Sequence, residues 1–459
     1  MSDVILKTSD QTTVPVYALS EAELESYLAS APDFLRVFAA SNAFKAKMGQ
    51  VLSVPGPSGA VERILFGVGG GTDPTIFRAL AAKLTAGDYE LQTFPSTLNL
   101  DDIVLAFGLG SYGFDRYKHR SGARPKLLAQ GANIDEVAQI VEACALARDM
   151  TNTPASDLGP FQIETIARDM AAAFKADISV IIGDDLLTQN YPAVHAVGRA
   201  AAADRAPRMI EMTWGAADHP SVVLVGKGVT FDTGGLDIKP SAGMRQMKKD
   251  MGGAAHVLAL GRMVMAANLP LRLTILVPAV ENAISGDAMR PGDVLNSRKG
   301  LTIEVGNTDA EGRLILADAL TRATELNPVL TLDMATLTGA ARVALGPQLP
   351  PYFTDDEALA ADIAACALEA HDPVWRLPLW KGYVDALDSD IADIKNDPDG
   401  WAQAGSVTAA LFLQKFAPTT SWAHFDIFAW NPRNRPGWTS GAEAQAIRGL
   451  YRLLSRRFA

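Results

Sequence analysis

Two short stretches of the chain carry charged residues whose types and spacing suit metal-assisted hydrolysis. The first, GKGVTFDTGGLDIKPSAGMRQMKKD, runs from Gly226 to Asp250, and the second, NTDAEGRL, runs from Asn307 to Leu314. Hard divalent cations bind carboxylate oxygens, and a pair of such ions both activates water and polarises a carbonyl. Four carboxylates from two segments can hold two ions if one carboxylate is shared. The charged residues that we single out in the two stretches are Lys227, Asp232, Lys239, Asp250, Asp309, Glu311 and Arg313.

Each carboxylate has a structural alternative when it is taken alone. Asp250 comes two residues before the Gly-Gly pair that starts a predicted helix and could cap that helix. Asp309 and Glu311 could be acids at a helix start, where the helix dipole favours them. Asp232 stands in FDTGG, where two glycines allow close backbone approach and unusual dihedral angles. All four together, with no histidine-rich motif competing, favour a dinuclear metal site.

Three basic residues accompany these carboxylates. Lys227 and Lys239 are flanked by glycine or proline, and a desolvated lysine can lose its proton and bind a metal or act in catalysis. A protonated lysine can instead stabilise a developing oxyanion. Arg313 offers a planar fork for a carboxylate-like anion, with a surface salt bridge as the alternative. None of the histidines lies in the two stretches, and each is expected to be packed or at the surface. They are His119, His195, His219, His256, His371 and His424.

Apolar segments precede both charged stretches. Near-continuous apolar strands that alternate with helices indicate a sheet covered on both faces. Ligands of such sheets bind outside the carboxyl ends of the strands. Lys227 and Asp232 follow the strand at 221–225, and Asp309 and Glu311 follow the strand at 301–305, so both charged stretches should lie at those ends. The predicted strands are 221–228, 271–280, 301–306 and 329–337, and the predicted helices are 252–268 and 311–326.

The N-terminal part of the chain predicts a smaller α/β domain. Segments 61–70 and 101–110 read as buried strands, and 75–87 reads as a helix that ends at Gly87. The glycine run at 67–71 lacks both the Lys-Ser/Thr ending of a phosphate loop and the full dinucleotide spacing, so a tight turn is favoured.

These patterns predict an α/β protein with two domains. We expect a small N-terminal α/β domain at 1–133 and a connecting amphipathic helix at 134–150. A turn-rich stretch at 150–160 follows, and the larger α/β catalytic domain occupies 151–459. Its central sheet should be mostly parallel and covered by helices.

Composition narrows the class of protein. A chain of 459 residues is too long for one core. Its 41 basic and 52 acidic residues give a net charge of −11, which argues against binding nucleic acid through basic patches. Cys144 and Cys366 are expected to be buried, reduced thiols. The sequence shows no secretory signal and no apolar run of the ~20 residues that a membrane span needs, so a cytoplasmic protein is expected.

The same motifs carry a family resemblance. VGKGVTFDTGGLDIKPSAGM, MKKDMGG and NTDAEGRL, followed by DMATLTGA at 333–340, closely resemble the leucyl aminopeptidase family (M17, cytosolic aminopeptidase). NTDAEGRL matches that family's signature octapeptide in full, and the resemblance extends from about Leu146 to the C-terminal region. It implies a metallo-exopeptidase that releases N-terminal amino acids from peptides. It also implies two divalent ions per subunit (Mn²⁺ or Zn²⁺, possibly Mg²⁺) and a homohexamer.

The resemblance further implies a role for each matching residue. The more exchangeable ion would be held by Asp232, Glu311 and Asp309, the last also through its backbone carbonyl. The tighter ion would be held by Lys227, Asp232, Asp250 and Glu311, so that Asp232 and Glu311 bridge the two. Lys239 would polarise the scissile carbonyl and stabilise the tetrahedral intermediate, and Arg313 would hold a bicarbonate-like anion that acts as general base. The positions that would contact substrate are Met247, Asn307, Thr336, Leu337 and Gly339.

One segment departs from the family pattern. HFDIFAWNP at 424–432 stands where many members have a His-Leu-Asp-Ile-Ala-Gly type of segment, so Phe428 replaces a small residue at the substrate side-chain pocket. A substrate preference other than leucine is therefore expected.

Two alternatives to a general aminopeptidase remain open. One is a dinuclear amidohydrolase restricted to dipeptides or amino-acid amides, and the other is a family member with an added DNA-binding role. An inactive homologue is disfavoured because the full set of charged site residues is present.

Overall fold

The computed structural model describes residues 2–118, 122–398, 401 and 403–459. The chain forms two compact units, Met1–Ala145 with Asn431–Ser440, and Leu146–Trp430 with Gly441–Ala459. The expected boundaries differ from these units in two respects. The chain passes between units inside helix α5 (Ile134–Asn152) rather than at its ends, and 431–440 belongs with the first unit.

The first unit is an α/β unit built on a six-stranded sheet with the strand order β1-β6-β5-β2-β4-β3. Its neighbouring strands are parallel, except that β3 and β4 are antiparallel. On β4, Ile64 and Phe66 enter the core beneath α3 and α4, whereas Leu65 enters the core beneath α2, because successive strand side chains point to opposite faces. The strands are β1 (Ile5–Leu6), β2 (Val14–Leu19), β3 (Val51–Pro55), β4 (Val61–Gly67), β5 (Gly87–Thr93) and β6 (Pro125–Leu128). The helices are η1 (Ser2–Val4), α1 (Leu24–Ser30), α2 (Asp33–Ser41), η2 (Pro74–Ile76), α3 (Phe77–Lys83) and α4 (Leu100–Gly110).

The prediction of a strand at 101–110 is wrong, because this segment forms helix α4. The Asn99 side chain accepts hydrogen bonds from the backbone N–H groups of Asp101 and Asp102 and so caps the helix start. An apolar run of this length fits a buried helix as well as a buried strand, and the cap decides between them. The strand at 61–70 is confirmed as β4.

Two other features of this unit match the predictions in part or in full. The helix predicted at 75–87 forms as η2 and α3 but ends at Lys83, and Gly87 already opens strand β5. The glycine run that follows β4 forms a turn, with positive φ at Gly69 (60°) and Gly71 (70°).

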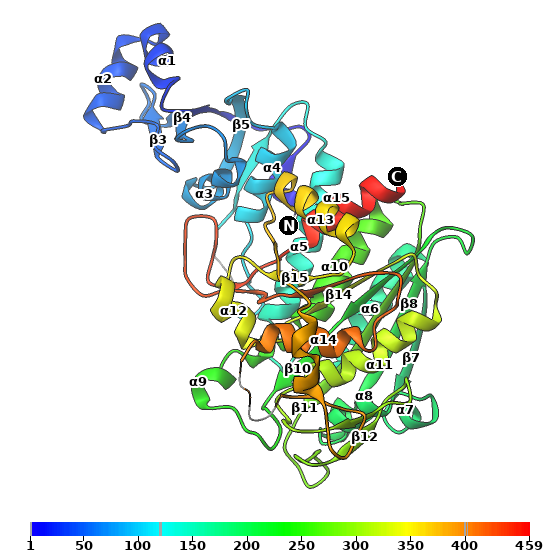
Figure 1. The fold of residues 1–459 in the computed structure, drawn as a ribbon. Helices are drawn as coiled ribbons and strands as arrows, with labels where there is room; N and C mark the ends of the chain where they lie inside the picture. Colours follow the sequence, from blue (N-terminus) through cyan, green and yellow to red (C-terminus); the bar gives the residue numbers. More distant parts are fainter. Residues whose placement is uncertain (1, 119–121, 399–400, 402) are drawn as a thin grey trace. The chain divides into compact units, whose positions relative to one another are not determined.

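The second unit contains the predicted central sheet, with nine strands (Figure 1). The strand order is β16-β15-β18-β14-β9-β11-β8-β7, and β10 pairs with β11 off this path. The sheet is mostly parallel, as predicted, and β8 and β15 supply its antiparallel pairs. The strands are β7 (Asp177–Ile182), β8 (Arg208–Trp214), β9 (Ser221–Gly226), β10 (Gly228–Asp232), β11 (Arg272–Asn282), β14 (Leu330–Ala335), β15 (Pro351–Phe353), β16 (Trp375–Arg376) and β18 (Ser421–Asp426).

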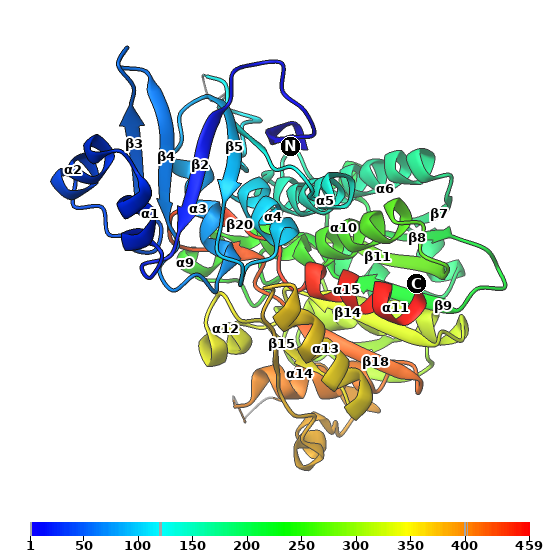
Figure 2. The same cartoon turned by 90° about the horizontal axis from the view of Figure 1, so that it is seen from above.

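Helices cover both faces of this sheet (Figure 2). Val223 and Val225 of β9 enter a core shared with α8, α11 and α14, while α10 packs on the other face, against α6 and α15. The long helices at 252–268 and 311–326 are confirmed as α10 and α11. The helices of this unit are α6 (Pro160–Phe174), α7 (Asp185–Thr188), α8 (Pro192–Gly198), η3 (Ala203–Arg205), α9 (Ser241–Met244), η4 (Met247–Met251), α10 (Gly252–Ala266), α11 (Glu311–Glu325), α12 (Gly339–Leu345), α13 (Glu357–Glu369), η5 (Lys381–Leu387), α14 (Gly405–Gln414) and α15 (Ile447–Phe458).

One predicted strand forms outside the central sheet. Residues Thr302–Glu304 form β13, which pairs antiparallel with β12 (Val294–Asn296) and parallel with β17 (Ile394–Lys395). The prediction that Asp309 and Glu311 follow a strand of the central sheet is therefore wrong. Both residues nevertheless lie at the carboxyl ends of the central strands, because hydrogen bonds between loops hold them there. The remaining short strands are β19 (Trp430–Asn431) and β20 (Gly441–Ala442).

Cys144 and Cys366 are both buried and neither forms a disulfide, as predicted. Within the described ranges, no helix combines the length and the apolar character that crossing a membrane requires.

Candidate active site

The first charged stretch lies at the carboxyl ends of strands in the central sheet, as predicted. Lys227 directly follows β9, and Asp232 is the last residue of β10. Asp250 lies in η4, just before α10. It does not cap that helix; its carboxylate instead accepts a hydrogen bond from Thr336 Oγ1 at 2.8 Å. The capping alternative for Asp250 is thereby excluded.

Hydrogen bonds between two loops bring the second stretch to the same edge. Thr308 Oγ1 donates to the carbonyl of Gly234 at 2.6 Å, and the Thr308 N–H donates to Asp237 Oδ2 at 2.8 Å. Asn282 Nδ2 donates both to Asp232 Oδ1 (2.8 Å) and to the Thr308 carbonyl (3.1 Å). This network, rather than a strand of the central sheet, positions Asp309 and Glu311.

The two glycines of FDTGG permit this close approach. Gly234 and Gly235 have φ of +89° and +65°, a left-handed conformation that glycine adopts without strain. A Cβ on Gly235 would lie 2.9 Å from Thr308 Oγ1, and one on Gly234 would lie 2.4 Å from the carbonyl oxygen of Asp237. The glycines thus let the loop after β10 contact the loop before α11.

Three carboxylates converge closely enough to share a cation. Asp232, Asp309 and Glu311 each offer an oxygen, and these oxygens lie within 4.8 Å of one another. Burial raises the pKa of Asp309 to about 6, and the neighbouring charge of Asp232 adds to this rise. The pKa of Glu311 is also raised, by burial first and then by Asp232.

Two lysines supply the nearest positive charges. Lys227 Nζ lies 2.7 Å from Asp250 Oδ2 and 3.0 Å from Glu311 Oε1. Lys239 Nζ lies 2.7 Å from Asp232 Oδ2 and also pairs with Asp309. Burial disfavours the charge on each lysine, but the surrounding carboxylates outweigh it and raise both pKa values.

Glu311 provides the best test of whether this cluster suits a metal. Its side chain is 1% exposed, and neither carboxylate oxygen accepts a hydrogen bond from the part of the chain that the structure describes. Lys227 Nζ lies 3.0 Å from Oε1 without forming a hydrogen bond, so both buried oxygens still lack the partners that a buried carboxylate needs. The donor set of Glu311, Asp232, Asp309 and Asp250 therefore fits hard divalent ions.

Arg313 lies on α11, two residues after Glu311, and part of its guanidinium already has a hydrogen-bond acceptor. Its Nη1 donates to the carbonyl of Asn396 at 2.5 Å, while its buried Nε donates to no acceptor among the described residues. Asn396 also holds the loop before α11, because its Oδ1 accepts from the N–H of Gly306 (2.8 Å) and its Nδ2 donates to the carbonyl of Asn307 (2.8 Å).

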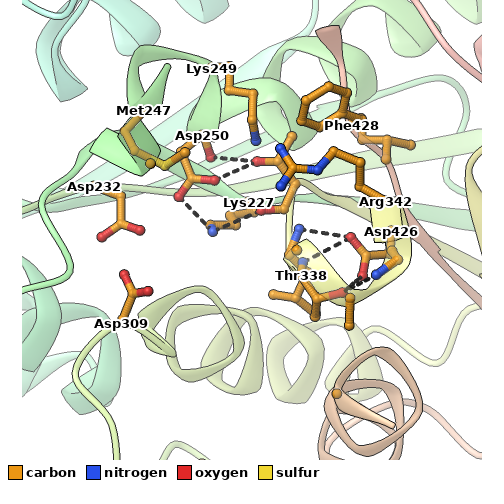
Figure 3. Close-up of a pocket in the computed structure, with 18 of the residues that line it drawn as sticks. Lys227, Asp232, Met247, Lys249, Asp250, Asp309, Thr338, Arg342, Asp426 and Phe428 are labelled. Carbon is orange, nitrogen blue, oxygen red and sulfur yellow. Dashed lines mark hydrogen bonds and ion pairs between the residues drawn. The ribbon is translucent and has the colours of Figure 1, made fainter. Parts of the chain in front are cut away.

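An open pocket of about 590 Å³ lies over this cluster (Figure 3). Every residue predicted from the sequence to belong to the site lines it, except Glu311, which is buried. The lining includes the predicted substrate positions Met247, Asn307, Thr336, Leu337, Gly339 and Phe428. No histidine among the described residues lines this pocket; His119 lies outside the described residues.

Both units match models of one peptidase family. Residues 145–451 match the catalytic domain of the cytosol aminopeptidase family, and residues 14–129 match the N-terminal domain of M17 aminopeptidases. The chain belongs to the cytosol aminopeptidase (M17) family. It is a metal-dependent aminopeptidase, and the dipeptide-restricted and DNA-binding alternatives are not favoured.

Relatives of this aminopeptidase cover most of its length. A probable cytosol aminopeptidase of Roseiflexus castenholzii is 40% identical over 367 residues, 75% of this chain and 74% of that protein. One of Chlorobium limicola is 36% identical over 456 residues, 90% of each chain.

Solved structures agree with this assignment. A cytosol aminopeptidase from Coxiella burnetii matches the whole of both chains with a TM-score of 0.95 and 42% identity. The bottromycin maturation enzyme BotP in complex with Mn matches 97% of this chain and 100% of its own, with a TM-score of 0.87 and 33% identity.

Several residues of the aminopeptidase pocket were not predicted from the sequence. Lys249 of η4 and Arg342 of α12 line it next to Phe428, with Lys249 Nζ 5.1 Å and the Arg342 guanidinium carbon 5.2 Å from the ring centre. Asn282 and Asn396, described above, hold its loops. Burial lowers the pKa of Lys249 to about 8. Lys249 lies in MKKDMGG, a segment that carries the family resemblance, and no motif singled out in the sequence contains Arg342.

Proposed function

We propose that the four carboxylates and Lys227 hold two divalent cations. Asp232, Asp309 and Glu311 would bind one ion, and Lys227, Asp232, Asp250 and Glu311 the other, with Asp232 and Glu311 shared. The observation that carries this assignment is the buried carboxylate of Glu311, which lies beside two other carboxylates and accepts no hydrogen bond from the described residues. When bound, the ions would activate a water molecule and polarise the scissile carbonyl.

We assign Lys227 to metal binding and Lys239 to stabilisation of the transition state. As a ligand, Lys227 must lose its proton, because a protonated ammonium has no lone pair to offer. Both side chains line the pocket, but that of Lys227 is 3% exposed and that of Lys239 is 15% exposed. Lys239 would therefore keep its proton and donate to the carbonyl oxygen of the substrate as negative charge develops there.

Arg313 would hold a bicarbonate-like anion that accepts the proton of the attacking water. The buried Nε without an acceptor among the described residues, beside the pocket, supports this role. A planar guanidinium binds a planar oxyanion through paired hydrogen bonds. Without such an anion, the Nε donor would remain buried and unsatisfied.

The proposed reaction is hydrolysis of the first peptide bond of a peptide, with release of the N-terminal amino acid. All proposed site residues belong to the second unit, to which we assign the chemistry. The ions would be Mn²⁺ or Zn²⁺, possibly Mg²⁺, since oxygen ligands with one nitrogen suit several metals. We infer a homohexamer, from the sequence resemblance alone, and a cytoplasmic location, which the names of the relatives support.

The test is metal removal and replacement. The chelated enzyme should lose hydrolysis of a panel of aminoacyl-p-nitroanilides, and each cation restored in turn should return activity to a different extent. Asp309→Asn and Glu311→Gln should lose bound metal as well as rate. Glu325→Gln, at the far end of α11, is the matched control and should keep both. A metal-free protein with full activity would overturn the proposal.

A further inference from the structure

Lys249 is a buried cation in the pocket that forms no ion pair with any described residue. Its side chain lines the pocket although the residue is only 6% exposed. No carboxylate of the described residues lies within ion-pair distance of its Nζ, in contrast to Lys227 and Lys239, which each contact two. Burying a charge is costly unless a partner of opposite charge joins it.

A second cation, Arg342, points to the same part of the pocket. Lys249 comes from η4, Arg342 from α12, and the Phe428 ring beside them from the segment after β18 (Figure 3). The Arg342 side chain also forms no ion pair within the described ranges. The backbone at Phe428 is held in place, because its N–H and that of Ala429 donate to Gln445 Oε1 at 3.0 and 2.8 Å.

The nearby carboxylates are already engaged. Asp250 accepts from Thr336 Oγ1 and pairs with Lys227. Asp426 accepts from the N–H groups of Leu337 (3.0 Å) and Thr338 (3.1 Å) and from Thr338 Oγ1 (2.6 Å). Neither can turn to Lys249 without breaking these bonds, so an anion on the substrate is the partner that this part of the pocket lacks.

We propose that Lys249, with Arg342, makes the pocket a binding site for the side-chain carboxylate of an N-terminal glutamate or aspartate. This proposal rests on the aminopeptidase function and narrows its substrate class. Lys249 would be the main determinant, because it is buried, and Arg342, which is exposed, would contribute less. A site built around a charged group discriminates strongly against an analogue that lacks the matching group.

The test compares glutamyl- with glutaminyl-p-nitroanilide, which differ in charge but hardly in size. The wild-type enzyme should have the higher kcat/KM for the glutamyl substrate. Lys249→Met should lower the glutamyl-to-glutaminyl ratio of kcat/KM by about 10- to 100-fold, the range for a hydrogen bond between charged groups. Lys249→Arg should restore part of the ratio, and Arg342→Gln should lower it less.

Arg245→Gln is the matched control. Arg245 is exposed, lies four residues before Lys249 and does not line the pocket, so this variant removes the same charge and should leave the ratio unchanged. Because the ratio is measured within one protein, a general loss of activity or of metal cancels. A wild-type ratio near one, or an unchanged ratio in Lys249→Met, would overturn the proposal.

Two further measurements distinguish the side-chain site from a different role of Lys249. Hydrolysis of leucyl-p-nitroanilide reports on the aminopeptidase function itself, so loss of all activity in the wild type contradicts that function rather than the role of Lys249. Comparing Leu-Gly with Leu-Gly amide tests whether Lys249 binds the C-terminal carboxylate of a dipeptide. If Lys249→Met changes the kcat/KM ratio of Leu-Gly to Leu-Gly amide and not the glutamyl-to-glutaminyl ratio, the proposed side-chain site is wrong.

Discussion

Single residues in this site are distinguished by how their charges are paired. Lys227 and Lys239 each contact two carboxylates, whereas Lys249 contacts none among the described residues. A buried charge with partners stabilises a fixed arrangement, and one without partners favours a ligand of opposite charge. We therefore propose three functions for the same residue type at three positions: metal binding, carbonyl polarisation and side-chain recognition.

Lys239→Ala tests the second of these functions. We expect the variant to keep its metal content and to lose kcat by about 10²- to 10³-fold, the usual cost of removing one oxyanion donor. Metal analysis alongside steady-state kinetics provides the measurement. If metal is lost with the lysine, the contacts of Lys239 with Asp232 and Asp309 are structural, and its assignment to the transition state is wrong.

Phe428→Ala tests how the ring shapes the pocket. The ring takes volume where a small side chain was expected, and one methylene in an apolar pocket already changes discrimination by ~1–3 kcal/mol. We expect kcat/KM ratios among Leu, Met, Ala and Phe substrates to change by tens-fold in Phe428→Ala, with the wild type favouring slimmer or differently shaped side chains. Phe161→Ala, which removes an exposed ring of α6, should leave these ratios as they are. Equal ratios in wild type and Phe428→Ala would show that the ring does not limit the pocket.

At the scale of elements, α10 connects the site to the C-terminal part of the second unit. His256 on α10 contacts the Gly252 carbonyl through Nδ1 (2.7 Å), and its Nε2 accepts from the Gln445 N–H (3.0 Å). Nδ1 must then carry the proton, so the ring is neutral. Gln445 in turn accepts from the N–H groups of Phe428 and Ala429. This chain of bonds joins a buried histidine to the pocket wall.

Stability should therefore depend on pH through His256. Burial lowers its pKa to about 4 from an ordinary value near 6.5. Between these values the unfolded chain binds a proton that the folded protein does not, so stability falls as pH decreases through this window, by up to about 3 kcal/mol. Urea unfolding at pH 7, 5.5 and 4.5 should show a smaller decrease for His256→Gln than for the wild type.

The control for this measurement is His195→Gln. His195 is half-buried beside Asp184 and lies outside the chain of bonds around His256, so this variant removes a histidine without breaking that chain. Equal slopes for wild type and His256→Gln would contradict the assignment, because the remaining carboxylates are common to all three proteins.

At the scale of the whole molecule, the two units match separate domain models of one family. We expect the protein to assemble as a hexamer. Light scattering coupled to size exclusion should give about six times the 48.8 kDa of one chain. A stable monomer at micromolar concentration would contradict this expectation, and the metal and substrate measurements above would be unaffected by that result.

The sequence by itself determined which residues are candidates for a metal site. Residue type and local spacing in two short motifs predicted the four carboxylates Asp232, Asp250, Asp309 and Glu311, and the family resemblance added Lys227. The sequence also predicted the long helices α10 and α11 and the covered, mostly parallel sheet, because these elements have strong periodic patterns. The apolar run at 101–110 was wrongly predicted as a strand, because its apolar pattern fits both structures and the Asn99 cap makes it a helix.

Only the tertiary structure decided which distant residues meet around that site. Strands β14 and β18 pair in parallel, so the segments that follow them, with α12 after one and Phe428 after the other, approach the same edge of the sheet. This places Arg342 and Phe428 beside Lys249, and no local pattern carries that information. Likewise, Asn282 and Asn396 hold loops that are far from them in sequence. Long-range packing and strand register fix these contacts, whereas sequence periodicity reports only on neighbours along one element.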